Sequence, residues 1–415
     1  MPSSLGFVAT KKPIVSRCLA LLICSVTLPA IASAQVLTAD EAVRLALENT
    51  PNRVFIDAPS QMAQGAVISA ETWRNPVLSV EREGERGFGG DRVETTVSLE
   101  RAFDFSGRRS LHADGARADL VAARAQGFVT QADLQADTLG AFYGVLAAQA
   151  ELEAAERLRE QFVSLEAATL QRVEAGDASR FELERVRQET LVLPGFVSEA
   201  QLNMQGARDE LFIATGSERA LSARIEGDLL PGTEGLATLG GANIPARLAV
   251  LEAGVEAAAA RETAASRLAP EVNLGLGVRH AEGMGAETGV VVSASLPLPL
   301  FDRNQGERLA RAADARLAEA RLRREQRRIE AEAGALRRRA AVLHQTATDY
   351  EADALVSARE MQRIALVSYQ SGEISVLEAI DALRAAFDAE TRAISLKFRA
   401  RQAEIALNAL LAETE

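Results

Sequence analysis

The sequence predicts an α+β membrane protein in which four transmembrane β-strands alternate with very long helices, arranged as two structural repeats. Three observations predict this class. Short motifs recur in the same order at offsets of 194 to 196 residues. Four segments alternate apolar and polar residues with the period of a β-strand. Residues 307–370 contain no proline and only Gly334, which is typical of a long helix.

The first 34 residues have the pattern of an export signal. A basic segment precedes a short apolar core, and Ala32-Ser33-Ala34 then predicts a cleavage site. The apolar core is too short to span a bilayer, which disfavours a membrane anchor. Both cysteines, Cys18 and Cys24, lie inside this signal, so we expect no disulfide and no thiolate metal site in the mature chain.

Composition disfavours several classes of function. The chain carries 46 Lys and Arg against 58 Asp and Glu, a net charge of −12, which makes nucleic acid a poor partner. It contains no zinc-protease, phosphate-loop or nucleophile-elbow motif. We expect His112 and His344 in helices and His280 beside a loop. Because these histidines are far apart in sequence, we expect no metal site, no cofactor and no catalytic site.

The mature chain is predicted to contain two structural repeats, residues 35–230 and 231–415. The segment VEAGDASRFELE (173–184) is echoed by YQSGEISVLEAI (369–380). Each repeat is expected to contain a helical entry segment, two short strands, a long helix, a glycine turn and a returning helix. The matched turn residues are Gly176 with Gly372, Ser179 with Ser375, and Glu182 with Glu378.

The predicted strands are Val77 to Glu83, Val93 to Glu100, Glu271 to Val278 and Val290 to Pro297. The glycine-rich segments Gly84 to Asp91 and Ala281 to Thr288 are predicted hairpin loops. One apolar and one polar face fit an outer-membrane barrel strand and also a half-buried soluble sheet. The helices are too long to cover a soluble sheet, and four strands cannot close a barrel. We therefore expect three chains to build a 12-stranded barrel.

The strands are predicted to leave the membrane through short polar turns. In LPLPLFDRNQG, Pro297 and Pro299 cannot donate to a strand ladder, and Phe301 suits an interfacial aromatic girdle. Asp302 or Asn304 is expected to cap the helix that follows. The equivalent segment of the first repeat is FDFSGRR, which contains Phe105 and Gly107.

The helices are predicted to form coiled coils. The stretch over residues 307–370 would be about 95 Å long without interruption. Pro194-Gly195 predicts a kink or break in the returning helix of the first repeat. A narrow apolar seam is expected in the last helix, formed by Leu377, Ile380, Phe387, Thr391, Ile394, Phe398 and Ile405.

With these motifs, residues 35–415 resemble the TolC-like outer-membrane efflux protein family. The resemblance rests on the duplicated plan, the RNP entry, the DFSGRR and PLPLFDRNQG exits, and the two G-x-x-S turns. The PLPLFDRNQG form is most similar to the heavy-metal (cobalt–zinc–cadmium type) efflux branch. The resemblance implies a homotrimer with a 12-stranded outer-membrane barrel, continuous with a long periplasmic α-helical coiled-coil barrel, and no catalysis. It also implies an exit duct that works with a periplasmic adaptor and an inner-membrane RND pump.

The resemblance places an adaptor-docking tip at the two glycine turns. Gly176 and Gly372 would let the chain reverse. Ser179 and Ser375 would cap the returning helices, with Glu182 and Glu378 as capping-box partners. This structural role alone explains all six residues, and docking is compatible with it. Nearby acidic side chains are candidates for a cation-attracting ring or for an ordinary solvated surface, namely Asp177, Glu373 and Asp381.

Two other functions remain open. An outer-membrane channel for drug efflux or type I protein secretion would have a similar duct. A periplasmic coiled-coil scaffold or adaptor would need the helices but not the four strands.

Overall fold

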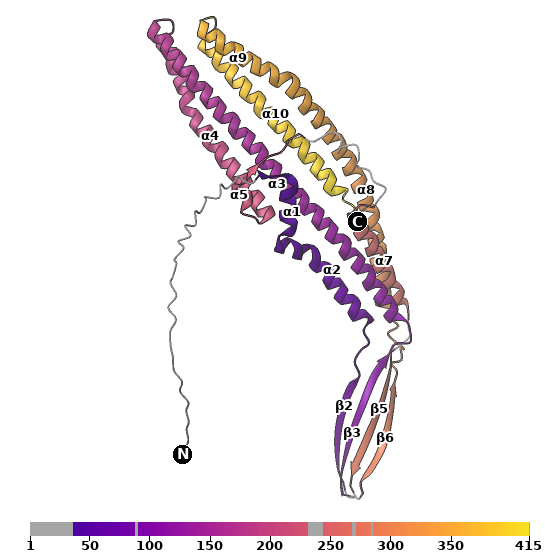
Figure 1. Ribbon diagram of the computed structural model, residues 1–415. Coiled ribbons are helices and arrows are strands. Elements are labelled where there is room, and N and C mark those ends of the chain that lie inside the picture. Colours follow the sequence, from indigo (N-terminus) through magenta and orange to yellow (C-terminus); the bar gives the residue numbers. More distant parts are fainter. Residues whose placement is uncertain (1–35, 88–89, 231–243, 268–270, 284, 415) are drawn as a thin grey trace, which may run out of the picture. The chain divides into compact units, whose positions relative to one another are not determined.

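The computed structural model describes residues 36–87, 90–230, 244–267, 271–283 and 285–414. The predicted export signal lies outside these residues, as does residue 231, where the second repeat is predicted to begin. From Val36 onward the chain forms one packed unit, with the sheet at one end of the helices and the helix-reversal turns at the other (Figure 1).

Two sets of elements follow each other along the chain in the same order. The first set is α1 (Ala39–Glu48), α2 (Thr50–Glu71), β2 (Val77–Gly87), β3 (Gly90–Phe103), α3 (Arg108–Ala175) and α4 (Arg180–Thr215). The second set is α7 (Ala246–Ser266), β5 (Val272–Glu282), β6 (Glu287–Ser295), α8 (Gln305–Asp349), the π-helix η1 (Tyr350–Leu355), α9 (Val356–Ser371) and α10 (Val376–Leu410). Three short elements are β1 (Val36–Leu37), α5 (Arg219–Ser222) and β4 (Arg224–Ile225), and β1 pairs with β4.

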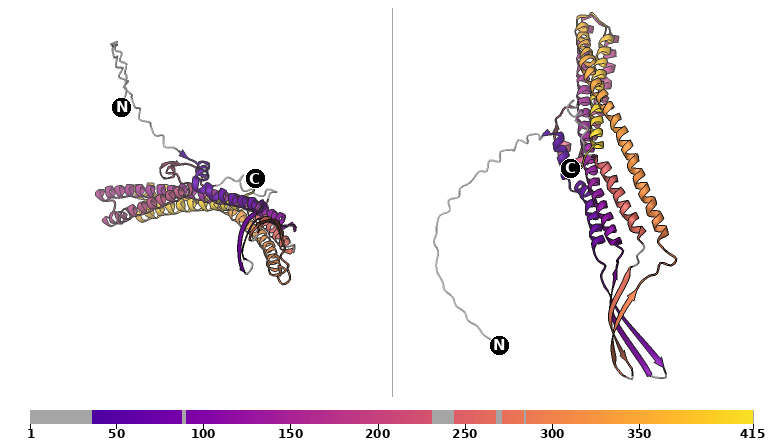
Figure 2. Two further views of the ribbon diagram at one scale, coloured as in Figure 1. Left: turned by 90° about the horizontal axis from the view of Figure 1, so that it is seen from below. Right: turned by 90° about the vertical axis from the view of Figure 1, so that its right-hand side faces the viewer.

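The four longer strands form one antiparallel sheet in the order β2-β3-β5-β6, and they twist about one another as they leave the helices (Figure 2). All four predicted strands are present. Their register aligns apolar residues in two rows across the sheet. One row contains Leu78, Leu99, Leu276 and Val292, and the next contains Val80, Val97, Val278 and Val290.

The two rows make one face of the sheet apolar, because directly opposed residues project to the same side. Their eight side chains are 41% to 77% exposed, so no other part of the described chain covers them. The opposite face is polar. There Glu94 pairs with Arg279 at 3.2 Å, and the Ser293 hydroxyl donates to Glu100 at 3.3 Å.

The strands extend into both segments that were predicted to be hairpin loops, so the predicted loops are too long. Gly84 pairs with Val93 and Gly87 with Gly90, so strand pairing extends through most of the segment assigned to the first loop. In the second hairpin Ala281 pairs with Glu287. Glycine weakens a strand but keeps its backbone donor and acceptor, which the ladder uses here. His280 therefore lies within β5, where its Nδ1 is 3.0 Å from the Thr288 hydroxyl, and not beside a loop.

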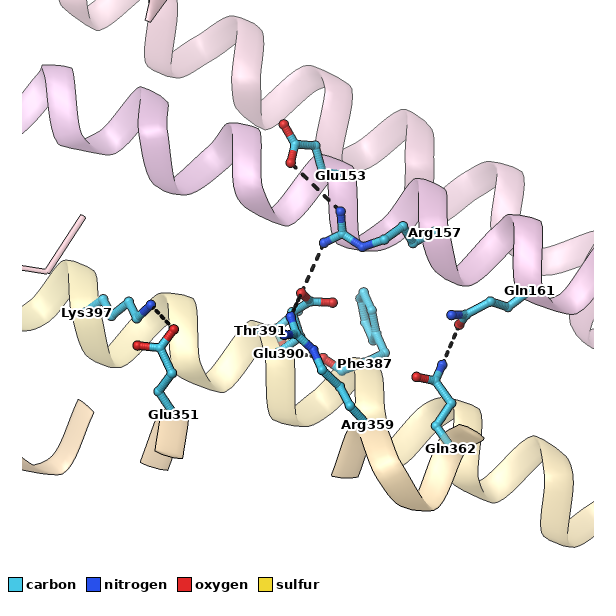
Figure 3. Close-up of polar contacts among 10 residues, drawn as sticks. All are labelled: Glu153, Arg157, Gln161, Glu351, Arg359, Gln362, Phe387, Glu390, Thr391 and Lys397. Atoms are coloured by element: carbon cyan, nitrogen blue, oxygen red, sulfur yellow. Dashed lines mark hydrogen bonds and ion pairs between the residues drawn. The ribbon is translucent and has the colours of Figure 1, made fainter. Parts of the chain in front are cut away.

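The helix α3 is the central packing element. It contacts α2, α4, α7 and α10, while α10 also packs against α8 and α9. Near the helix-reversal turns one buried cluster joins Leu158, Phe162 and Leu165 of α3 to apolar residues of α4, α9 and α10. These residues are Val186, Leu193, Tyr369, Val376, Ala379, Ile380 and Leu383. Polar contacts join α3, α9 and α10 beside this cluster (Figure 3).

Three helical predictions need correction. Of the kink or break predicted at Pro194, the break is absent, since α4 continues through the proline. Pro194 and Gly195 lie on the exposed side of α4, while the flanking Leu193 and Val197 are buried and hold the helix in place. The long helix after the second strand pair is interrupted by η1. Leu377 is 49% exposed, so the predicted seam does not include it.

Candidate functional sites at the helix-reversal turns and the strand exits

The two helix-reversal turns are closed by glycines. Gly176 ends α3 with φ of 88°, and Gly372 ends α9 with φ of 81°. A side chain strains this left-handed conformation, so the predicted role of both glycines in chain reversal is confirmed. The backbone bonds also match, because the N–H groups of Asp177 and Glu373 donate at 2.8 Å to carbonyls of the preceding helix.

The predicted serine caps are present in both turns. The Ser179 hydroxyl accepts from the Glu182 N–H at 3.2 Å, and the Ser375 hydroxyl accepts from the Glu378 N–H at 3.4 Å. Only the second turn has a complete capping box, in which the Ser375 N–H donates to the Glu378 carboxylate at 2.7 Å. Hydrogen bonds from the Ser375 backbone and hydroxyl lower the pKa of the Glu378 carboxyl below its usual value.

Sequence reasoning missed the contacts that tie the two turns together. Arg172 of α3 donates at 2.7 Å to the carbonyl of Tyr369 at the end of α9, and at 3.2 Å to the carbonyl of Asp177 in its own turn. The Tyr369 hydroxyl is 2.8 Å from the Thr169 hydroxyl in the buried interior. These residues are about two hundred positions apart, and no local pattern connects them.

The three acidic candidates occupy different surroundings. Asp177 and Glu373 lie in the two turns, and Glu373 accepts from the Ser368 hydroxyl at 3.1 Å. Asp381 lies on α10 and lines an apolar groove of about 420 Å³ between α9 and α10, together with Glu378 and Met361. Among the residues that the structure describes, no group of three or more His, Cys, Asp or Glu is arranged to hold a metal ion.

The strand exits are aspartate turns that the sequence predicted only in part. Asp104 accepts from the Ser106 N–H at 2.8 Å, and Asp302 accepts from the Asn304 N–H at 2.9 Å. Gly107 and Asn304 then begin the next helices in the left-handed conformation, with φ of 73° and 60°. Asn304 is the N-cap residue of α8, which is one of the two expected alternatives, but its side chain makes no cap hydrogen bond.

Neither side chain reaches a free N–H of α8. The Asp302 carboxylate is used by its own turn, and the Asn304 amide donates instead at 3.1 Å to the carbonyl of Ala265 at the end of α7. The Asn304 side chain therefore ties the exit turn to the neighbouring helix α7.

The second strand exit has its prolines after the end of the strand, as predicted, and the aromatic residues of both exits are exposed. The strand β6 ends at Ser295, before Pro297 and Pro299. Phe301 is 91% exposed and Phe105 is 73% exposed. Sequence reasoning did not single out Trp73, which lies between α2 and β2. It is the only tryptophan in the chain, and this could have drawn attention to it.

The chain is similar in structure to known outer-membrane proteins. No protein-family model matches the chain. The outer-membrane channel OprN superposes with a TM-score of 0.76 at 17% identity, covering 91% of this chain and 90% of OprN. This chain has the fold of the TolC-like outer-membrane efflux channels. The outer membrane protein VceC of Vibrio cholerae agrees, with a TM-score of 0.75, 17% identity and coverage of 90% and 96%.

Two further proteins are similar to this chain, one in structure and one in sequence. CusC, studied for its transmembrane channel formation, superposes with a TM-score of 0.74 at 18% identity, covering 91% of this chain and 92% of CusC. The cobalt-zinc-cadmium resistance protein CzcC of Cupriavidus metallidurans is 23% identical in an alignment of 397 residues that covers 90% of each chain. The predicted resemblance to the TolC-like family and its cobalt–zinc–cadmium branch is confirmed. None of the described helices is long and apolar enough to cross a bilayer.

Proposed function

We propose that this protein is the exit duct of a tripartite efflux system in the outer membrane of a Gram-negative bacterium. The observation that carries the proposal is the alignment of two apolar rows on one face of the sheet, with polar residues on the other. Lipid on the apolar face and water on the polar face suit this arrangement. The helices then extend into the periplasm.

The duct is a homotrimer in this proposal. Within the described chain β2 and β6 are sheet edges, and an edge in lipid would leave backbone N–H and C=O groups without partners. Pairing β2 of one copy with β6 of the next closes a 12-stranded barrel from three chains. The helices of the three copies form the coiled-coil tunnel that continues from it.

The helix-reversal turns form the entrance and dock a periplasmic adaptor, which connects the duct to an inner-membrane RND pump. The docking residues are Gly176, Ser179, Glu182, Gly372, Ser375 and Glu378. In the trimer Asp177, Glu373 and Asp381 would present carboxylates to cations at the entrance. The cargo is heavy-metal cations, a class that the name of the relative CzcC supports.

Growth of a deletion strain across Zn²⁺, Co²⁺, Cd²⁺, Ni²⁺ and a panel of hydrophobic drugs tests the function. Selective metal sensitivity that the gene restores is the expected result. Drug sensitivity alone would keep the duct and overturn the metal cargo. Recovery of the protein in the inner-membrane or soluble periplasmic fraction would overturn the duct itself.

Of the other functions, a coiled-coil scaffold is disfavoured by the sheet. A periplasmic scaffold would place eight apolar side chains, each more than two-fifths exposed, in water. Export of drugs or proteins would use the same duct, and the growth panel separates drugs from metals.

A further inference from the structure

The apolar face of the sheet has a cationic border on the side of the helices. Arg101 and Phe103 follow Val97 and Leu99 at steps of two along β3, so they continue the same face. The register partner of Arg101 on β5 is Leu274. A guanidinium group therefore lies where the apolar surface ends and the helices begin.

Trp73 organises this border. The Arg109 guanidinium lies 3.7 Å from the centroid of the Trp73 ring, and that of Arg101 lies 4.8 Å from it. Arg101 is also 5.3 Å from the centroid of the Phe103 ring. Such contacts hold a guanidinium over an aromatic ring and leave its N–H edge free to bind an anion. Trp73 is about half exposed, so the group is open to a ligand.

Neither of the two arginines at Trp73 has a counter-ion among the described residues, whereas two arginines nearby do. Arg74 pairs with Glu271 at 2.8 Å and Arg117 with Glu71 at 2.5 Å. Across the described part of the chain, neither Arg101 nor Arg109 has a carboxylate at ion-pair distance. Arg109 donates at 3.3 Å to a backbone carbonyl, that of Glu71, and the buried Nε of Arg101 has no hydrogen-bond partner.

A cavity adjoins these side chains. Its volume is about 370 Å³, which is within the range of small-molecule sites. Arg74, Arg108 and Arg109 line it together with the carboxylates of Asp104 and Glu271, so three arginines face two acidic side chains around the space. Arg101 contacts Trp73, which lines the cavity.

We propose that Trp73, Arg101 and Arg109 bind the phosphate headgroup of an anionic phospholipid from the periplasmic leaflet of the outer membrane. The inference rests on the proposed position of the sheet in that membrane. Guanidinium groups bind phosphate in a bidentate geometry, and tryptophan favours the headgroup level. The acyl chains would lie on the apolar rows beyond Arg101. Two positive charges without counter-ions favour an anionic over a zwitterionic headgroup.

Because Trp73 is the only tryptophan, its fluorescence reports on this site alone. The full chain is reconstituted in phosphatidylcholine vesicles that contain a small fraction of either brominated phosphatidylglycerol or brominated phosphatidylcholine. We expect stronger quenching by the brominated anionic lipid, with an apparent affinity ratio of roughly five-fold for each arginine. The double variant Arg101→Gln, Arg109→Gln should quench equally with both lipids. The control Arg180→Gln, an exposed arginine at the far helix-reversal turn, should keep the preference.

The outcomes separate this inference from the proposed function. Equal quenching of the unmodified chain by both lipids overturns the anionic headgroup site and leaves the membrane position intact. Absence of quenching by either lipid overturns the membrane position as well. Inorganic phosphate that removes the preference at millimolar concentration would show a small-anion site and overturn the lipid assignment. Quenching by brominated phosphatidylcholine at an unchanged level shows that the double variant is folded and inserted.

Discussion

The hydroxyl groups of Thr169 and Tyr369 lie 2.8 Å apart in the interior between α3 and α9, and both residues are fully buried. Thr169 already donates to the carbonyl of Leu165 at 2.7 Å, so the Tyr369 hydroxyl is the donor in the pair. This bond, with the contact of Arg172 to the Tyr369 carbonyl, joins the end of the first long helix to the end of the second.

Replacing Tyr369 by phenylalanine should lower the free energy of unfolding by about 1 kcal/mol, because a buried hydrogen bond is lost without a change of volume. Tyr369→Ala should lower it by about 3 to 5 kcal/mol, because a cavity is added. Denaturant unfolding of the protein in detergent measures both. In a double-mutant cycle, Tyr369→Phe and Thr169→Val should be less than additive. Strict additivity would contradict the pairing.

A Gly→Ala substitution should have opposite effects at the turn residue Gly372 and at Gly206 in the interior of α4. Gly372→Ala should destabilise the protein by roughly 1 to 2 kcal/mol, because φ of 81° strains any residue with a Cβ. Space is not the reason, since the nearest atom to the new Cβ is 3.4 Å away. The matched control is Gly206→Ala within α4, where no atom lies within 4 Å of the new Cβ. It should stabilise by roughly 0.4 to 1 kcal/mol. Unfolding midpoints that shift in the same direction would argue against backbone strain at Gly372.

These turns show what local sequence could predict. A glycine, a serine three residues later and a glutamate three beyond it specify a helix end and a helix start by short-range hydrogen bonds alone. Period-two alternation predicted the strands, which is also a local signal, because successive side chains of a strand point to opposite faces of the sheet. The rows themselves, such as Leu99 beside Leu276, required the register between strands distant in sequence.

Other features carried no local signal. The π-helix η1 contains neither glycine nor proline, and its Glu351 pairs at 2.5 Å with Lys397 of α10. The π-helical turn is therefore accompanied by a contact between helices, and the sequence of η1 alone does not predict it. Pro194 shows the converse, since a strong local signal for a break is overridden by burial of Leu193 and Val197 on the other side of α4.

The complete capping box at the second turn predicts a pH-dependent effect of Ser375→Ala. The folded-state pKa of Glu378 is lowered, so its stabilising contribution is present above the ordinary glutamate pKa of 4.5 and is lost as the pH falls through the folded-state pKa. Ser375→Ala removes the serine hydroxyl and should therefore destabilise the protein at about pH 7 and less at about pH 3. The measurement is the difference in unfolding midpoint between variant and parent at each pH. A difference that grows toward acid would be inconsistent with this linkage.

Glu390 joins three helices in the polar group beside the buried cluster (Figure 3). Its carboxylate accepts from Arg157 of α3 at 3.1 Å and from Arg359 of α9 at 2.6 Å. Glu390→Gln should lower the free energy of unfolding by about 1 kcal/mol, a modest effect because both guanidinium groups are about half exposed. The control is Glu360→Gln, which breaks one exposed pair within α9 and should change stability less than Glu390→Gln does. Equal effects of the two variants would show that Glu390 does not act as a link between helices.

The acidic residues at the helix-reversal turns predict the selectivity of the proposed entrance. In a trimer, Glu373 and Asp381 contribute carboxylates from each of the three copies, and such a concentration of negative charge attracts cations. Glu373→Gln with Asp381→Asn should therefore lower the cation-to-anion permeability ratio by roughly two-fold or more. Reversal potentials across a planar bilayer with a potassium chloride gradient measure this ratio. Glu218→Gln, an exposed acid beside α5, is the control for a simple change in net charge. If both variants keep the parental ratio, Glu373 and Asp381 lie outside the ion path, and the entrance must be formed by other residues.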